Sequence, residues 1–152
     1  MSDKFTGIST KDGVRGEGDS LILGMLAGVI AALIGAGLWM AFKVATGWDV
    51  GYLAFGIGAF VGFAIRAAGN GSSFIFGVAG AVLTFLSCVT GEFLARVQLA
   101  TTPQHDFYGV LTHIDPIEMV NSMVTQTQAM MWVIFAIGII EGYKFSIRPK
   151  QP

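Results

Sequence analysis

The chain has 152 residues, of which 53% are hydrophobic and 12% charged, with a formal net charge of -1 and a mean hydropathy of +0.67. Soluble domains usually contain about a quarter charged residues, so this composition excludes an ordinary soluble domain and predicts a membrane protein. Nine scattered Lys and Arg residues form no phosphate-tracking patch, and a single cysteine excludes both an intramolecular disulfide and a thiol-rich metal site. We therefore expect no nucleic-acid partner and no cofactor.

The chain begins with a polar, glycine-rich stretch, which predicts a flexible tail over residues 1–20. A transmembrane domain is expected over 21–147, because a helix crosses a bilayer with about 20 apolar residues and the chain offers four such stretches. We predict an all-α integral membrane protein with four transmembrane helices in an antiparallel bundle. The spans are expected at about 21–43, 50–68, 73–95 and 124–146, with an outer segment 97–123 and a second tail 148–152.

Small residues recur at helical spacing in every expected span. In a bilayer such rows let helix backbones approach and gain dispersion contacts, because hiding apolar surface from lipid gains little. The positions expected to pack are Gly24, Gly28, Gly58, Gly62, Gly77, Gly80, Gly138 and Gly142. Near the end of the first span, Trp39 and Trp48 are expected in an interfacial aromatic belt.

The row of the second span, Ala54, Gly58 and Gly62, leads to a single cation, Arg66. An intramembrane cation is costly and calls for a partner. The second and fourth spans run in the same direction, so we expect Arg66 to pair with Glu141 near one membrane face. The alternative is that Arg66 snorkels to the headgroups. An Asn-Gly turn after this span predicts a hairpin with the third.

Glu92 and Arg96 close the third span four residues apart, a favourable helical ion pair. We expect this outer charge pair near Lys43. The charge pair also suits the mouth of an ion or proton path, along which Thr84 and Ser87 would supply polar groups. The alternative is that these hydroxyls bond to their own helix backbone, as is common in membrane helices. Cys88, in the same span, is expected to be inert.

The outer segment contains the side chains best suited to a metal: His105, His113, Met119 and Met123. Imidazole suits copper or zinc, and thioether sulfur suits reduced copper. The alternative is that the histidines are solvated and the methionines pack against apolar neighbours. Asp115-Pro116 predicts a helix start, and this helix is expected to run into the last span.

Basic residues predict the orientation, because cytoplasmic loops carry more Lys and Arg. With both termini cytoplasmic, seven basic residues lie inside and two, Lys43 and Arg96, lie outside. The seven are Lys4, Lys11, Arg15, Arg66, Lys144, Arg148 and Lys150. Residues 97–123 are then on the outer side of a multi-pass protein.

The chain resembles a group of small bacterial four-span membrane proteins. The resemblance is carried by Trp48, Gly51, Gly58, Gly62, Arg66, Gly69 and the pair Tyr143-Lys144. It implies the same topology in a bacterial cytoplasmic (inner) membrane. The group has no assigned activity, so the resemblance implies nothing about chemistry.

The sequence contains no Ser–His–acid arrangement, phosphate loop or paired carboxylates of an active site, so we expect no enzyme. Beyond membrane lipid, the expected partner is a second copy or a larger membrane complex. The small-residue rows favour a protein that works by association, as a homo-oligomer or accessory subunit. A small oligomeric channel or transporter and a metal-handling module remain as alternatives.

Overall fold

The structure is a computed structural model that describes residues 20–47, 51–70, 72–102, 106–126 and 129–147. The expected tails, apart from Ser20, lie outside these residues. All six described elements are helices: α1 (Leu21–Thr46), α2 (Gly51–Gly69), α3 (Phe74–Leu99), α4 (Phe107–His113), α5 (Pro116–Gln126) and α6 (Ala129–Ser146). Four of them, α1, α2, α3 and α6, are long and apolar enough to cross a membrane. This confirms the predicted all-α, multi-pass class.

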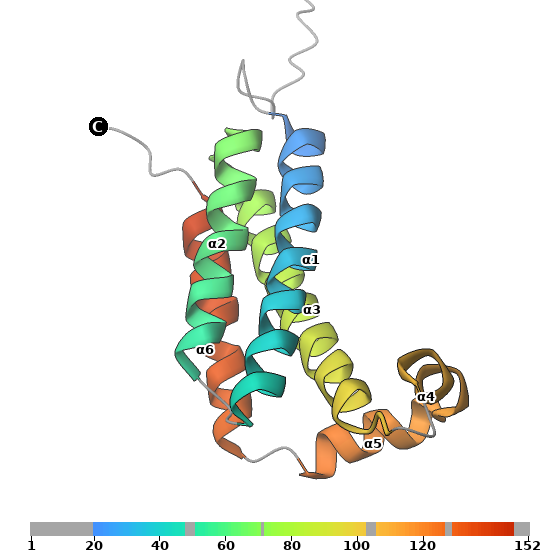
Figure 1. The fold of residues 1–152 in the computed structure, drawn as a ribbon. Coiled ribbons are helices and arrows are strands. Elements are labelled where there is room, and N and C mark those ends of the chain that lie inside the picture. Colours follow the sequence, from blue (N-terminus) through green and yellow to red (C-terminus); the bar gives the residue numbers. More distant parts are fainter. Residues whose placement is uncertain (1–19, 48–50, 71, 103–105, 127–128, 148–152) are drawn as a thin grey trace, which may run out of the picture.

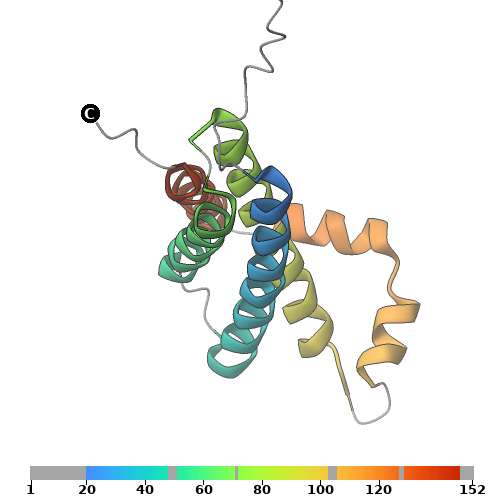
Figure 2. The same cartoon turned by 90° about the horizontal axis from the view of Figure 1, so that it is seen from above.

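The four long helices stand side by side, and the two short ones project sideways from one end of them (Figure 1). The same view turned by 90° also places α4 and α5 beside the long helices (Figure 2). We call α4 and α5 together the arm. The arm end of the bundle is the end where α3 finishes and α6 begins, and the terminal end is the opposite one, where α1 begins and α6 finishes.

The helices with the most extensive mutual contacts are not neighbours in the chain. α2 packs most extensively on α6 and α1 on α3, followed by α1 on α2, α3 on α6 and α2 on α3. The two helices of each leading pair run in the same direction (Figure 1). Between α1 and α3 the chain returns once through α2, and between α2 and α6 it returns once through α3 before the arm. The four helices therefore surround one axis in the order α1, α2, α6, α3.

Glycines lie where the helices approach most closely. A Cβ on Gly58 would meet the carbonyl of Gly138, and one on Gly62 would lie 2.9 Å from the carbonyl oxygen of Gly142. On the other side of α6, a Cβ on Gly80 would meet both Ser146 and the Gly142 carbonyl. Gly142 is thus approached from α2 and from α3, so the small residues of three helices converge on one point of α6.

The first helix uses its small residues in the same way. A Cβ on Gly24 would lie 3.1 Å from the Cα of Gly69, and one on Gly28 would meet Ile65 and Leu83 at 2.6–2.7 Å. On α3, a Cβ on Gly77 would meet the ring of Tyr143 at 2.5 Å. All eight glycines expected to pack therefore face other helices of the same chain.

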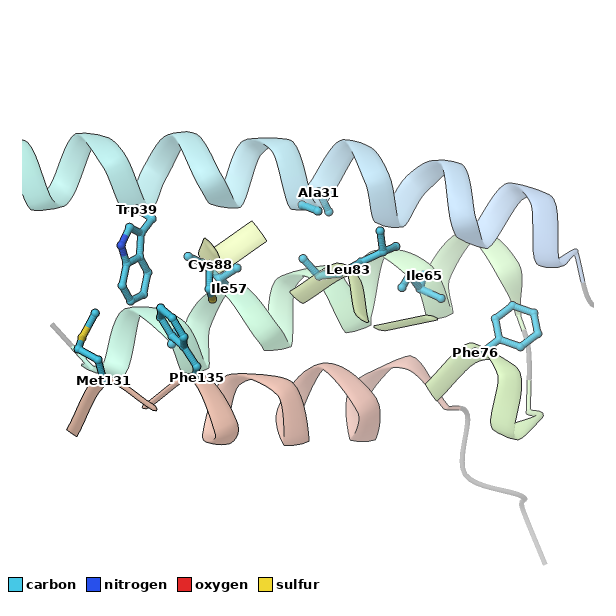
Figure 3. Packing of buried hydrophobic residues seen from close by; sticks show 12 residues of the cluster. Ala31, Trp39, Ile57, Ile65, Phe76, Leu83, Cys88, Met131 and Phe135 are labelled. Atoms are coloured by element: carbon cyan, nitrogen blue, oxygen red, sulfur yellow. The ribbon is translucent and has the colours of Figure 1, made fainter. Parts of the chain in front are cut away.

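Larger apolar side chains fill the space between these contacts (Figure 3). Trp39, Met131 and Phe135 lie together toward the arm end, where the rings of Trp39 and Phe135 meet edge to face with centroids 5.8 Å apart. Ile65 and Phe76 lie toward the terminal end (Figure 3). Because lipid is as apolar as these side chains, their contribution is close packing rather than removal from water.

The helix bounds differ from the expected spans mainly around the arm. The expected outer segment contains a helix that was not predicted, α4, which Asp106 caps by accepting a hydrogen bond from the Gly109 amide. The helix expected to run unbroken into the last span instead ends as α5 at Gln126, and α6 begins at Ala129. Its predicted start is present, with the Ile117 amide donating to the Asp115 carboxylate at 2.8 Å.

Candidate functional site: a buried carboxylate cluster and the arm

The most elaborate polar arrangement in the described chain surrounds Glu92. Its Oε1 accepts from Lys43 Nζ at 2.6 Å and from Arg96 Nε at 2.9 Å. Its Oε2 accepts from Lys43 Nζ at 2.7 Å and from the indole nitrogen of Trp39 at 3.2 Å. Glu92 itself is only 1% exposed. We call Trp39, Lys43, Glu92 and Arg96 the Glu92 cluster.

Helical spacing on two helices builds this cluster. Trp39 and Lys43 are one turn apart on α1, and Glu92 and Arg96 are one turn apart on α3, so each pair shares a face. Between these faces, Gly91 lets α3 approach Trp39: a Cβ there would lie 2.7 Å from the Cβ of Trp39. The predicted Glu92–Arg96 pair is formed, and Lys43 joins it.

Trp39 corrects one expectation. It is 2% exposed and bonded to Glu92, so it is not part of an interfacial aromatic belt. An indole N–H buried in an apolar bundle requires an acceptor, and the carboxylate on α3 supplies it. Trp48, the other tryptophan expected in the belt, lies outside the described residues.

The cluster can hold a negative charge inside the bundle. A buried carboxylate is tolerated only when it is paired and hydrogen-bonded, and here three side chains donate to it. The lysine and arginine side chains remain 15% and 21% exposed, so the cluster reaches the surface through them. Its direct effect is to fasten α1 to α3.

Further polar groups follow α3 toward the terminal end. The hydroxyl of Ser87 donates to the carbonyl of Ala32 on α1 at 2.7 Å, which adds a second polar bond between these helices. Thr84 is fully buried, and its hydroxyl has no hydrogen-bond partner. Cys88 is buried as well. One turn from Thr84 toward the terminal end, Gly80 lies against Gly142, so α3 and α6 are in direct contact there.

The expected pair of Arg66 with Glu141 is not formed. Glu141 Oε1 instead lies 3.5 Å from Lys144 Nζ, and none of the described carboxylates forms an ion pair with Arg66. The packing of α2 on α6 explains this, since Gly62 lies against Gly142 and Phe145. Arg66, one turn beyond Gly62, is therefore level with the end of α6, more than one turn (about 5 Å) past Glu141.

At the corner between α4 and α5 lies an open hollow of about 360 Å³, which we call the elbow hollow. It is lined by His113, Ile114, Asp115, Glu118, Met119 and Ser122. His113 Nδ1 lies 2.8 Å from the carbonyl oxygen of Gly109. Because a carbonyl only accepts, Nδ1 carries the proton, and Nε2 of the neutral ring is left as an acceptor.

The structure gives the metal hypothesis limited support. His113 and Met119 line the same hollow, whereas Met123 is not among its lining residues and His105 lies outside the described part of the chain. Among the described residues, no group of three or more His, Cys, Asp or Glu side chains is placed to hold a metal ion. Comparisons with known protein families, with curated proteins and with solved structures give no match for the chain.

Proposed function

We propose that this protein is a small integral membrane protein that works by association, as a homo-oligomer or as an accessory subunit of a larger membrane complex, and that the arm makes the contact. The observation that carries this proposal is the placement of the arm. It projects sideways from a bundle whose helices are closely packed (Figure 2). Among the described residues, the most extensive packing of the arm on a long helix is a limited contact of α4 with α3. The bundle then serves as an anchor.

The route of association differs from the one that the small-residue rows suggested. Those rows are occupied by contacts within one chain, so they are not left over for a partner. Gly37 and Gly56 are not members of these rows, and a Cβ on either would meet nothing within 4 Å. A partner is better accommodated at the elbow hollow, where Asp115 and Glu118 supply negative charge and His113 and Ser122 supply hydrogen-bonding groups. This chemistry fits a basic segment of the partner.

The seven-to-two distribution of basic residues supports an orientation with both termini in the cytoplasm, and the proposed location is a bacterial cytoplasmic membrane. The arm then lies on the outer side, where it meets the outer regions of neighbouring membrane proteins. Binding and positioning, rather than catalysis, is the proposed activity.

Native mass spectrometry of the protein in lipid nanodiscs tests the proposal. The wild type should give an oligomer or a complex with a co-purifying membrane protein of fixed stoichiometry. Glu118→Lys reverses a charge in the elbow hollow and should reduce the associated fraction at least severalfold. Thr125→Lys adds the same charge to α5 outside the hollow and should leave association unchanged. A strictly monomeric wild type, or equal loss in both variants, would overturn the proposal.

A channel is the competing candidate, favoured by the row of buried polar groups that runs from Glu92 past Ser87 to Thr84. Flux of ions or protons through proteoliposomes separates the two functions. An anchor gives no flux above that of empty vesicles, so Glu92→Gln has nothing to alter. Flux that Glu92→Gln abolishes would establish the channel instead.

A further inference from the structure

α5 has two distinct faces. At 100° per residue, its apolar side chains fall on one side of the helix and its polar ones on the other. The apolar side consists of Ile117, Met119, Val120, Met123 and Val124, and the polar side includes Glu118, Asn121, Ser122 and Thr125. Ile117, Val120 and Val124 are 78%, 57% and 54% exposed, so the described residues leave this apolar face largely uncovered.

The connection to α6 fixes the height of α5 relative to the membrane. α5 ends at Gln126 and α6 begins at Ala129, so the two ends are at most about 11 Å apart. α6 has 18 residues, which make a helix of about 27 Å, close to the roughly 30 Å of the hydrocarbon core. The whole of α6 is needed to cross. Its first residues, and with them the end of α5, therefore lie at the membrane surface.

The direction of α5 keeps it at that surface. In Figure 1 it runs across the direction of the four long helices rather than along it. Exposed aromatic residues lie at the same end of the bundle: Tyr52 in the first turn of α2, Trp132 in the first turn of α6, and Tyr108 on α4. Tyr and Trp side chains of this kind mark the headgroup level.

We infer that α5 lies flat in the membrane surface at the arm end, with Ile117, Val120 and Val124 inserted at the boundary between lipid headgroups and acyl chains. A helix with one apolar and one polar face is the usual form of such an interfacial segment. Of the α5 residues that line the elbow hollow, Glu118 and Ser122 lie on the polar side and Met119 on the apolar side, and none is one of the three inserted residues. Lipid contact and partner binding thus use different residues of α5, and either can fail without the other.

Site-specific fluorescence in phosphatidylcholine vesicles tests this placement. Single cysteines are introduced at Val120 or Val124 and, as controls, at Asn121 or Thr125 on the polar side. The background is Cys88→Ala, which removes the one native cysteine. Each protein is labelled with an environment-sensitive dye, and quenching is compared between shallow doxyl lipids and aqueous iodide. All four positions lie on the arm, so the bundle is left intact, and thermal unfolding of each labelled protein checks its fold.

Labels at 120 and 124 should be quenched severalfold more by doxyl lipid than those at 121 and 125, and the order should reverse for iodide. Equal iodide quenching at all four positions would place α5 in water and overturn the inference. Labels at 120 and 124 that are shielded from both quenchers would mean that protein covers this face, which would also overturn it. Neither result would affect association through the elbow hollow.

Discussion

Gly56 and Gly58 are two residues apart on α2 but have opposite surroundings. A Cβ on Gly58 would meet the Gly138 carbonyl, whereas one on Gly56 would meet nothing within 4 Å. Gly58→Ala should therefore lower the free energy of unfolding by about 1–3 kcal/mol, because backbone cannot yield as a flexible side chain does. Gly56→Ala should be neutral or stabilise by up to about 1 kcal/mol through helix propensity. Unfolding in mixed micelles measures the stability of both variants. Equal stability of Gly58→Ala and Gly56→Ala would show that the α2–α6 contact is looser than described.

Two glutamates near opposite ends of the bundle allow a second comparison. Glu92 is 1% exposed and accepts from three side chains, whereas Glu141 has a longer contact, 3.5 Å, with a largely exposed lysine. Glu92→Gln should destabilise the bundle by about 3 kcal/mol, the lower end of the range for breaking a buried pair, because Lys43 and Arg96 keep some access to solvent. Glu141→Gln should cost less than about 1 kcal/mol.

Unfolding in mixed micelles also compares the stability lost by Glu92→Gln with that lost by Glu141→Gln. A loss for Glu92→Gln no larger than that for Glu141→Gln would mean that the cluster does not fasten α1 to α3. Lys43→Met in the Glu92→Gln background removes a partly buried cation as well. The double variant should recover part of the stability lost by Glu92→Gln, because the lysine left without its carboxylate partner is replaced by an apolar side chain.

At the scale of the helices, the sequence is sufficient to predict the spans but not their partners. Runs of about 20 apolar residues identify α1, α2 and α3 to within a few residues at each end. The small-residue rows correctly indicate which face of a helix is packed, as Gly58 and Gly142 show. They do not indicate which helix packs there. Any row fits any other, so the sequence does not show whether a row packs within the chain or against a partner.

The candidate site was predictable only where its residues are close in sequence. Glu92 and Arg96 are one turn apart, and helical spacing alone pairs them. Trp39 and Lys43 are 53 and 49 residues away from Glu92, so their contacts depend on which face of α1 meets α3. The Arg66–Glu141 expectation failed for a related reason: running in the same direction fixes orientation but not the offset along the axis.

The arm should be the least stable part of the described chain. α4 has seven residues, too few for a helix to be stable alone, and its packing on α3 is slight. In hydrogen exchange of the Glu118→Lys variant in nanodiscs, in which the proposed association is reduced, α4 amides should therefore exchange first, those of α5 later, and those of α1 and α3 last. Protection of α4 equal to that of α3 in this variant would contradict the prediction.

At the scale of the whole molecule, an even number of spans places the start of α1 and the end of α6 on the same side of the membrane. The arm must then lie on the other side, and association through it requires that side to be reachable by the partner's outer regions. The distribution of basic residues predicts which side this is. In the sequence, seven of the nine precede α1, lie in the last turn of α2 or α6, or follow α6, and two, Lys43 and Arg96, lie in the last turns of α1 and α3.

Reporter fusions test the orientation. A green fluorescent protein joined after the last residue should fluoresce, because it folds in the cytoplasm, and alkaline phosphatase inserted between α4 and α5 should be active, because it needs the outer compartment. Replacing Lys4, Lys11, Arg15, Lys144, Arg148 and Lys150 by Gln leaves one basic residue at the terminal end against two at the arm end. Since Lys and Arg set the orientation, this variant should lose fluorescence in a large fraction of molecules. Unchanged reporters in the variant would show that something other than charge, such as insertion of α5 into one leaflet, holds the protein in place.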